Sequence, residues 1–251
     1  MKYLYRFYTF FLALPILVLA TFLTALTTSI GSTLGNASFW GYYPGRVWSR
    51  IVCVLLFIRV QVIGREHLDK NTSYVFVANH QGAFDIFLIY GYLGGNFKWM
   101  MKKSLRKLPF IGKACADAGH IFVDRGNPKG MIESIKHAER TLISGTSVVV
   151  FPEGVRSYTG AMSRFKRGAF QLATELQLSI VPMTINGSFR VYPRNSRWVT
   201  PHPLTLTIHP PIYQHIDILQ SKGENMEAAK QEAMNRAMEE SARTIESALL
   251  T

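Results

Sequence analysis

The 251-residue sequence has few cysteines, no internal repeat and no low-complexity linker. Its two cysteines, Cys53 and Cys115, lie in different contexts and belong to no paired motif, so we expect reduced thiols and no structural metal. Hydrophobic residues make up 48% of the chain, which excludes disorder as its general state. A chain of this length accommodates one sizeable α/β domain with an appendage.

Acidic residues are also scarce, with 16 Asp and Glu against 28 Lys and Arg. Residues 1–220 hold 24 basic and 10 acidic side chains, whereas residues 221–251 hold 4 basic and 6 acidic ones. The main part of the chain is therefore strongly basic, and its end is mildly acidic. A basic surface suits nucleic acid, anionic lipid or phosphorylated small substrates, and charge alone does not distinguish these partners.

The absence of charge near the N-terminus favours lipid over nucleic acid. No charged residue occurs from Phe7 to Gly45, and the run FYTFFLALPILVLATFLTALTTSI is long enough, at about 1.5 Å per helical residue, to reach through most of a bilayer core. A signal peptide is the alternative, because Lys2 and Arg6 precede the run. We favour membrane association, since the run is longer than the ~7–15 residues of a signal-peptide core and a second apolar segment follows it.

This second segment, residues 47–64, carries Arg50 and Arg59 about half a helical turn out of phase, so a helix here suits an interface better than a span. Both ends of the apolar region are basic, which a single span cannot reconcile with the positive-inside tendency. We therefore predict that residues 1–63 form a membrane-associated helical hairpin, which dips into one leaflet on the cytoplasmic face of the cell inner membrane. Positions suited to a kink or turn are Pro15, Gly31, Gly35 and Pro44.

Beyond Gly64, short β-branched and aromatic runs alternate with segments of helical period. Strands are expected at residues 73–79, 119–123, 146–151, 178–185 and 204–208, and helices at 85–93, 104–118, 128–143 and 165–176. This alternation indicates an α/β domain, which we assign to residues 64–220. Residues 221–251 are predicted to form a charged amphipathic helix that packs on this domain.

The stretch VANHQGAFDIF, residues 77–87, places His80 after a predicted strand and Asp85 at the start of a predicted helix. Within one regular strand the two would lie about 16 Å apart, and within one helix about 140° apart, so a turn between two elements is needed to bring them together. An aspartate that accepts from one imidazole nitrogen fixes the tautomer and leaves the other nitrogen as a base for a hydroxyl. The alternative is that Asp85 only caps its helix.

A second motif, VVVFPEGVRS at residues 148–157, ends a predicted strand in a crowded turn. Arg156 can fork onto phosphate oxygens, and Gly154 lets the backbone approach a ligand. An ordinary Pro-Gly turn with a solvated arginine is the alternative. Between the two motifs, residues 98–113 contain six cations and no acid, interleaved with apolar side chains. Such a run is typical of a solvated charged face, and it also suits a membrane surface at headgroup level.

Four ordered pieces, NHQGAFD, KKSLRKLPFIG with GHIFVDR, FPEGVRS and VPMTI, resemble the lysophosphatidic acid acyltransferases, the 1-acylglycerol-3-phosphate acyltransferase family of glycerolipid synthesis. The resemblance covers about residues 64–210 and implies a mixed sheet flanked by helices. It implies that His80 and Asp85 are the catalytic pair. The residues it assigns to the acceptor and its phosphate are Lys103, Arg125, Glu153, Gly154 and Arg156. The family usually has Thr where this chain has Val155, so a hydroxyl is missing from that turn.

The reaction implied by this resemblance is acyl transfer from a thioester of coenzyme A or acyl carrier protein to the 2-hydroxyl of lysophosphatidic acid. The product is phosphatidic acid, for phospholipid biosynthesis. The partners implied are membrane lipid, lysophosphatidic acid and the acyl donor, with no nucleic acid, no metal and no cofactor besides the donor. No Ser or Cys lies in a nucleophile motif, so we expect direct transfer without an acyl-enzyme. Two alternatives are a same-fold acyltransferase for another lysolipid acceptor and a non-enzymatic lipid-binding protein at the membrane.

Overall fold

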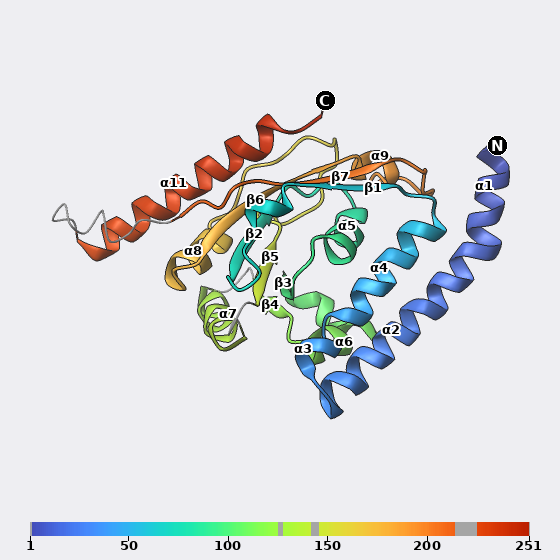
Figure 1. Cartoon of the computed structure of the whole chain (residues 1–251), viewed down its shortest axis with the longest axis horizontal. Helices are drawn as coiled ribbons and strands as arrows, with labels where there is room; N and C mark the ends of the chain where they lie inside the picture. The colour runs from blue at the N-terminus through green and yellow to red at the C-terminus, as the bar shows by residue number, and fades with distance from the viewer. Residues whose placement is uncertain (1, 125–127, 142–145, 214–224, 251) are drawn as a thin grey trace.

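Seven strands form one mixed sheet in the part of the chain that the computed structural model describes, residues 2–124, 128–141, 146–213 and 225–250 (Figure 1). The strand order is β1-β7-β6-β2-β5-β3-β4, and neighbouring strands are parallel except for β6 and β7. The strands are β1 (Val60–Ile63), β2 (Tyr74–Ala78), β3 (Phe97–Lys102), β4 (Ile121–Val123), β5 (Ser147–Val150), β6 (Ser179–Asn186) and β7 (Leu204–Ile208). The prediction of a mixed α/β sheet flanked by helices is confirmed.

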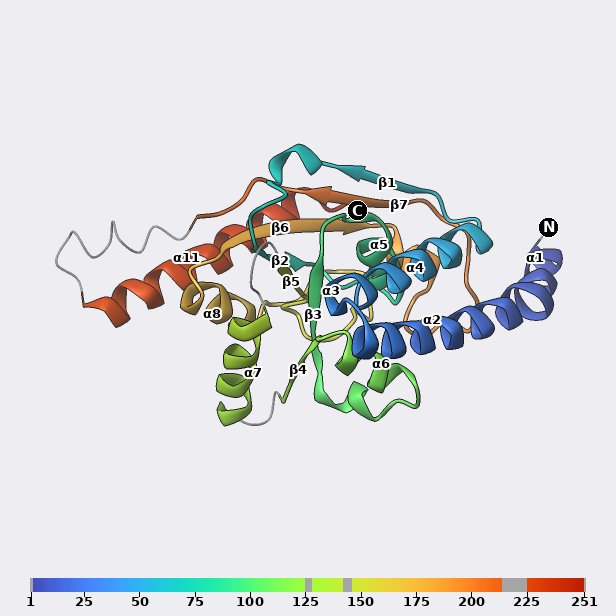
Figure 2. The ribbon, with the colours of Figure 1, turned by 60° about the horizontal axis from the view of Figure 1, so that its bottom comes forward.

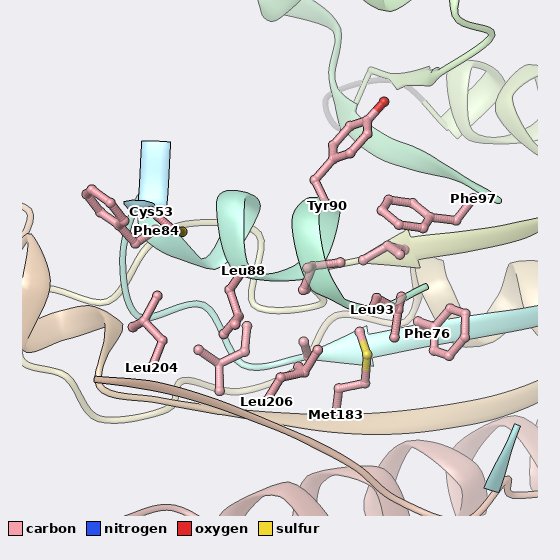
Figure 3. Close-up of a cluster of buried hydrophobic side chains, with 14 of the residues drawn as sticks. Cys53, Phe76, Phe84, Leu88, Tyr90, Leu93, Phe97, Met183, Leu204 and Leu206 are labelled. Atoms are coloured by element: carbon pink, nitrogen blue, oxygen red, sulfur yellow. The ribbon is translucent and has the colours of Figure 1, made fainter. Parts of the chain in front are cut away.

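Helices cover both faces of the sheet, because its central strands are apolar on both sides. In β2, Phe76 belongs to one buried cluster and its neighbour Val77 to another. Helices α4 (Tyr43–Leu55) and α5 (Phe84–Tyr92) cover the first cluster, and Figure 3 shows its side chains between α5 and the sheet. On the other face lie α7 (Pro128–Thr141), α8 (Gly168–Glu175) and α11 (Met226–Ser247), as Figure 2 shows.

The N-terminal residues form one long helical run of α1 (Lys2–Tyr8), the π-helical turn η1 (Thr9–Ala13) and α2 (Leu14–Leu34). The π-helical turn lies just before Pro15, which has no N–H for the helical ladder. By length and composition this run could cross a membrane, and few of its residues are buried. After a turn and the short α3 (Ala37–Trp40), α4 runs back beside α2 (Figure 1), which gives the predicted helical hairpin.

The hairpin packs on the helix that carries the aspartate of the first motif. The ring of Trp48 in α4 lies 4.9 Å from that of Phe87 in α5, centroid to centroid. Nearby, the Arg50 Nε–H donates to the carbonyl oxygen of Gly91 at 2.8 Å. Helix α4 is therefore part of the domain core, whereas α2 lies outside α4 and exposes most of its apolar side chains.

The segment at residues 47–64 is not one continuous helix. Helix α4 ends at Leu55, Phe57 adopts a positive φ of 56°, and Val60 begins a strand that pairs with β7. Arg59 therefore does not share a helix with Arg50, and the prediction of a single out-of-phase helix is wrong. The β-branched run of β1 favours the strand. The sheet thus begins before the boundary predicted after residue 63, and the boundary predicted after residue 220 lies outside the described residues.

Residues 98–113 divide into a buried and an exposed part. Lys98, Trp99 and Met100 lie in β3 and are at most 8% exposed, so the interpretation of this run as a surface is wrong for them. Most of the remaining residues are exposed, and the apolar side chains of Leu105 and Phe110 are among them. Pro109 divides the helix predicted at 104–118 into η3 (Lys103–Lys107) and α6 (Ile111–Asp117). The remaining short elements are η2 (Arg65–His67) and α9 (Ser188–Val191).

Candidate active site

His80 and Asp85 meet at the carboxyl end of β2, in the strand–turn–helix arrangement that the sequence predicts. His80 Nδ1 lies 2.7 Å from Asp85 Oδ2, and the Gly82 N–H donates to the same oxygen at 2.9 Å. Asp85 is fully buried in the first turn of α5, and His80 is partly exposed. A Cβ on Gly82 would lie 2.7 Å from the Ser188 hydroxyl, so this close approach requires glycine.

The contact fixes the state of the imidazole. A carboxylate on Nδ1 holds the neutral His80 ring in the tautomer that carries its proton on that nitrogen. Nε2 then keeps a lone pair, and it has no hydrogen-bond partner within the described residues. Ala83, not Asp85, occupies the N-cap position of α5, so the aspartate is not the helix cap. The pair can therefore take a proton from a hydroxyl at Nε2 while Asp85 stabilises the imidazolium.

The second motif holds the main chain of His80. The His80 N–H donates to Glu153 Oε1 at 2.6 Å, and its carbonyl oxygen accepts from the Ser157 N–H at 2.8 Å. The other oxygen of Glu153 accepts from both the N–H and the hydroxyl of Ser163, each at 2.7 Å. Glu153 is only 2% exposed, so its buried carboxylate joins the β2–α5 turn to the loop after β5. Gly154, with φ at 82°, supplies the left-handed residue of that loop.

Aromatic stacking fixes the plane of the His80 ring. Phe151 lies parallel to the imidazole, with ring centroids 3.9 Å apart and an interplanar angle of 8°. The Trp99 ring also stacks with Phe151, with centroids 5.6 Å apart. Sequence reasoning did not assign either aromatic residue to the site. The signal for Phe151 was its place at the carboxyl end of an apolar strand, directly before the second motif.

Two buried ionisable groups, His120 and Lys98, hold the strand that carries Trp99. The backbone N–H of Trp99 donates to His120 Nδ1 at 3.3 Å. Burial, with the nearby Lys98, lowers the pKa of His120 to about 3, so the ring is neutral and can accept this bond. Burial also lowers the pKa of Lys98, whose Nζ donates to the carbonyl oxygen of Ala118 at 2.7 Å. These contacts assign both groups to the framework of the site.

Asn79 is a further framework residue that sequence reasoning missed. Its Nδ2 donates to the Ile185 carbonyl oxygen at 2.9 Å, and its Oδ1 accepts from the Ile185 N–H at 2.7 Å. The fully buried side chain ties β2 to β6 beyond their last ladder pair, Ala78 with Met183. An asparagine that closes an apolar strand, just before His80, was the signal for this role.

The predicted phosphate-binding cations lie in different loops. Lys103 follows β3, forms an exposed ion pair with Asp124 at 3.3 Å and lines a cavity of 350 Å³. Arg156 follows β5 and is half-buried, and its guanidinium has no hydrogen bond or ion pair within the described ranges. Arg125 lies outside the described residues. The structure therefore brings Glu153 to His80 directly, and it leaves the Lys103 and Arg156 side chains accessible to an anion.

Neither cysteine belongs to the two motifs. Cys53 is buried in the cluster beneath α5, and Cys115 lies in α6; both are free. Burial raises the pKa of Cys115 to about 11, so its sulfur stays protonated and is a poor nucleophile. Across the described ranges, no three His, Cys, Asp or Glu side chains group as a metal site.

The part of the chain that carries both motifs matches a known protein family. Residues 59–186 match the family model described as Acyltransferase. The chain is 32% identical over 174 residues to the chloroplastic 1-acyl-sn-glycerol-3-phosphate acyltransferase LPAT1 of Arabidopsis thaliana, which covers 68% of this chain and 48% of that protein. It is 35% identical over 156 residues to the 1-acyl-sn-glycerol-3-phosphate acyltransferase alpha of Homo sapiens, covering 62% and 55%. The chain thus spans about half the length of the curated relatives it matches.

The fold also matches a solved structure. The crystal structure of the 1-acyl-sn-glycerophosphate acyltransferase from Thermotoga maritima aligns with a TM-score of 0.58 and 22% identity, covering 94% of this chain and 99% of that one. At this identity the likeness supports the fold alone. The relatives confirm the resemblance that the sequence motifs indicated. Since the family model matches just over half of its residues, the chain belongs to the acyltransferase family.

Proposed function

We propose that this protein transfers a fatty acyl group from an acyl thioester to the 2-hydroxyl of lysophosphatidic acid, giving phosphatidic acid for phospholipid biosynthesis. The observation that carries the proposal is the contact between His80 Nδ1 and Asp85, which leaves Nε2 free to act as a base. The names of the Arabidopsis and human relatives support the choice of acceptor.

In the proposed reaction, the 2-hydroxyl donates to His80 Nε2, and its oxygen attacks the thioester carbonyl carbon as the ring takes the proton. Asp85 stabilises the resulting imidazolium through Nδ1. When the tetrahedral intermediate collapses, the ester carbonyl forms again, the C–S bond breaks and the leaving thiolate takes the proton from Nε2. The histidine thus returns to its starting state, and no acyl-enzyme is formed.

Within this proposal, Lys103, Arg125 and Arg156 bind the phosphate of the acceptor, because guanidinium and ammonium groups form strong charged hydrogen bonds with phosphate. Glu153 receives a different role from the acceptor binding that the resemblance implies. Both of its oxygens accept from groups of the protein itself, and a carboxylate repels phosphate. We therefore assign Glu153 to positioning His80, and Gly154 to shaping the acceptor turn.

We further propose that the hairpin, which ends with α4 at Leu55, holds the protein on the cytoplasmic face of the cell inner membrane by lying in one leaflet. Large apolar side chains are exposed along α1 and α2, Phe7, Leu19 and Leu23 among them. Arg6 lies over the ring of Trp198 at 4.9 Å, a pairing suited to a headgroup-level interface. The proposed catalytic domain begins with β1 at Val60, and α11 packs on it.

An acceptor panel tests the proposal. Purified protein in vesicles is assayed against several lysolipids, with palmitoyl-coenzyme A and palmitoyl acyl carrier protein as donors. Lysophosphatidic acid is expected to give the highest kcat/KM, and a higher value for another lysolipid would support the same-fold alternative. Absence of transfer to every acceptor would favour the non-enzymatic lipid-binding protein.

Two variants test the mechanism in the same assay. His80→Ala should lower kcat by about 10²–10⁴-fold while the protein stays folded and membrane-bound, because the general base is lost. Asp85→Asn should be nearly as damaging, because an amide supports the wrong tautomer. Near-normal turnover by His80→Ala would refute this mechanism.

A further inference from the structure

A groove of 790 Å³ begins at Gln81, the residue that follows His80. Its walls are the loop after β5, the turn after β6 with helix α9, His202 before β7, and the end of α11 with the residues that follow it. Residues from these walls include Gly160, Ala161, Gly187 and Arg190. The groove lies beside the first motif, and none of the described residues assigned to the acceptor lines it.

The groove extends toward β6, away from Lys103. Gly187 and Arg190 follow β6, whereas Lys103 follows β3, and the strand order here is β6-β2-β5-β3. Strand β5 lies between them, and the loop after it carries Arg156 as well as the groove residues Gly160 and Ala161. Two substrates must reach His80 in the proposed reaction. An acceptor phosphate held between Lys103 and Arg156 leaves the β6 side of the groove, at Gly187 and Arg190, for the thioester.

The polar groups of the groove indicate what binds there. Gln81 is 8% exposed, its Nε2 makes one long contact of 3.5 Å with the Gly160 carbonyl oxygen, and its Oε1 has no partner within the described residues. A hydrocarbon chain would leave this carboxamide unsatisfied, whereas an amide of a ligand can pair with it. Arg190 is exposed, and its guanidinium has no partner in the described ranges, so it can take a phosphate.

We infer that this groove binds the 4′-phosphopantetheine arm of the acyl thioester, with Gln81 pairing with an amide of the arm and Arg190 with its phosphate. The arm is extended, contains two amides and ends in a phosphate, and it is common to coenzyme A and acyl carrier protein. Identifying the ligand of this groove as the acyl donor rests on the proposed function. Glu246 also lines the groove and can accept from an amide N–H or a hydroxyl of the arm, so the phosphate lies toward Arg190.

The end of the chain is held in place as a wall of this site. The Leu250 N–H donates to Asn186 Oδ1 at 2.8 Å, and Asn186 Nδ2 donates to the Ala248 carbonyl oxygen at 2.9 Å. Leu249 and Leu250 then line the groove. The C-terminal helix therefore contributes directly to the proposed donor site.

Steady-state kinetics with three donors test the inference. The donors are palmitoyl-coenzyme A, palmitoyl acyl carrier protein and palmitoyl-N-acetylcysteamine, which keeps one amide and lacks the phosphate. Arg190→Ala should raise KM about fivefold for the two phosphate-bearing donors and leave the third unchanged, because an exposed charged contact is lost. Gln81→Leu should raise KM about threefold for all three donors. Arg236→Ala, an exposed arginine of α11 outside the groove, is the matched control and should change neither.

Other outcomes overturn the inference. A rise in KM confined to coenzyme A would mean that Arg190 meets the nucleotide phosphates instead of the shared arm. A rise in the acceptor KM would make this the acceptor groove. Unchanged donor KM values in both variants would show that the donor does not bind in this groove.

A binding measurement separates this inference from the proposed function. S-hexadecyl-coenzyme A is a thioether that cannot transfer its chain, and its Kd for the full-length protein in micelles is measured by calorimetry. Arg190→Ala should weaken binding about fivefold. If the wild-type protein binds the analogue with this dependence yet does not acylate lysophosphatidic acid, the proposed function fails and the groove assignment stands. Equal Kd values for the wild-type protein and both variants would overturn the groove assignment.

Discussion

Replacing Glu153 with glutamine separates a positioning role from acceptor binding. The carboxylate accepts from the His80 N–H at 2.6 Å and from the N–H and hydroxyl of Ser163 at 2.7 Å each. Glutamine keeps the shape but offers only one oxygen, so at least one buried donor faces an amide NH₂ and loses its acceptor. An unpaired buried donor costs about 1–3 kcal/mol, so we expect the free energy of unfolding to fall by about 2 kcal/mol. For a protein of this size, that corresponds to a drop of about 4–8 °C in Tm.

The matched control is Glu175→Gln. The Glu175 carboxylate is 41% exposed and pairs with Lys230 at 3.1 Å, a surface contact worth less than about 1 kcal/mol. Thermal unfolding by circular dichroism and steady-state kinetics are measured for both variants. Glu153→Gln should lower Tm and kcat with little change in the acceptor KM, whereas the control should change neither. A wild-type Tm and kcat with a raised acceptor KM would refute the positioning role and return Glu153 to the acceptor site.

Three further changes test other parts of the molecule. Arg156→Ala should lower the acceptor kcat/KM by about 10–100-fold, since charged hydrogen bonds contribute about 1.5–3 kcal/mol. Arg156→Lys should lower the acceptor kcat/KM by less. Steady-state kinetics with each substrate varied in turn measure both effects. Leu19→Glu with Leu23→Glu, on the exposed face of α2, should make vesicle flotation weak and salt-sensitive, because a charge in the bilayer core costs about 2–3 kcal/mol. The free energy of unfolding should fall as the pH drops from 6.5 toward 3. His120 takes up a proton over this range in the unfolded protein, whereas in the folded protein its pKa of about 3 keeps it neutral. His120→Asn, which can still accept from the Trp99 N–H, should flatten this dependence in urea unfolding.

Each of these has a contrary outcome. A defect of Arg156→Ala confined to the thioester KM would remove Arg156 from the acceptor site. Flotation of the glutamate variant that equals the wild type in high salt would mean that α2 is not the main anchor. An unchanged pH dependence in His120→Asn would assign the acid sensitivity to other groups, such as His209, whose pKa is lowered by burial and by the nearby His67.

The contact between His80 and Asp85 could be predicted because it is local. Five residues separate the pair, and a strand, a turn and a helix leave few ways to arrange them. The bond between the His80 N–H and Glu153 joins residues 73 positions apart, so it depends on β2 and β5 being neighbours in the sheet. The sequence indicated that both motifs end strands, but strand order does not follow from strand position. A buried role for Glu153 therefore became evident only in the folded protein.

Strands β1 and β3 were missed for different physical reasons. No glycine, proline or other turn residue separates the residues of β1 from the apolar run of α4, so composition gave no sign that the helix ends at Leu55. In β3, Lys98 is buried, which contradicts the usual exposure of lysine. Its ammonium is satisfied by the carbonyl oxygen of Ala118, at the end of α6. Such compensation comes from a distant part of the chain, and local pattern cannot predict it.

Helix α4 of the hairpin packs on α5, the helix that carries Asp85, so the proposed membrane anchor and the proposed catalytic pair belong to one packed unit. In the proposed function, an acceptor lipid therefore meets the protein within the plane of the membrane and not from bulk water. The concentration that would govern turnover is the mole fraction of acceptor in the surface. Diluting lysophosphatidic acid with an inert phospholipid, at constant total acceptor, should therefore slow each enzyme molecule, whereas adding buffer to the same vesicles should not.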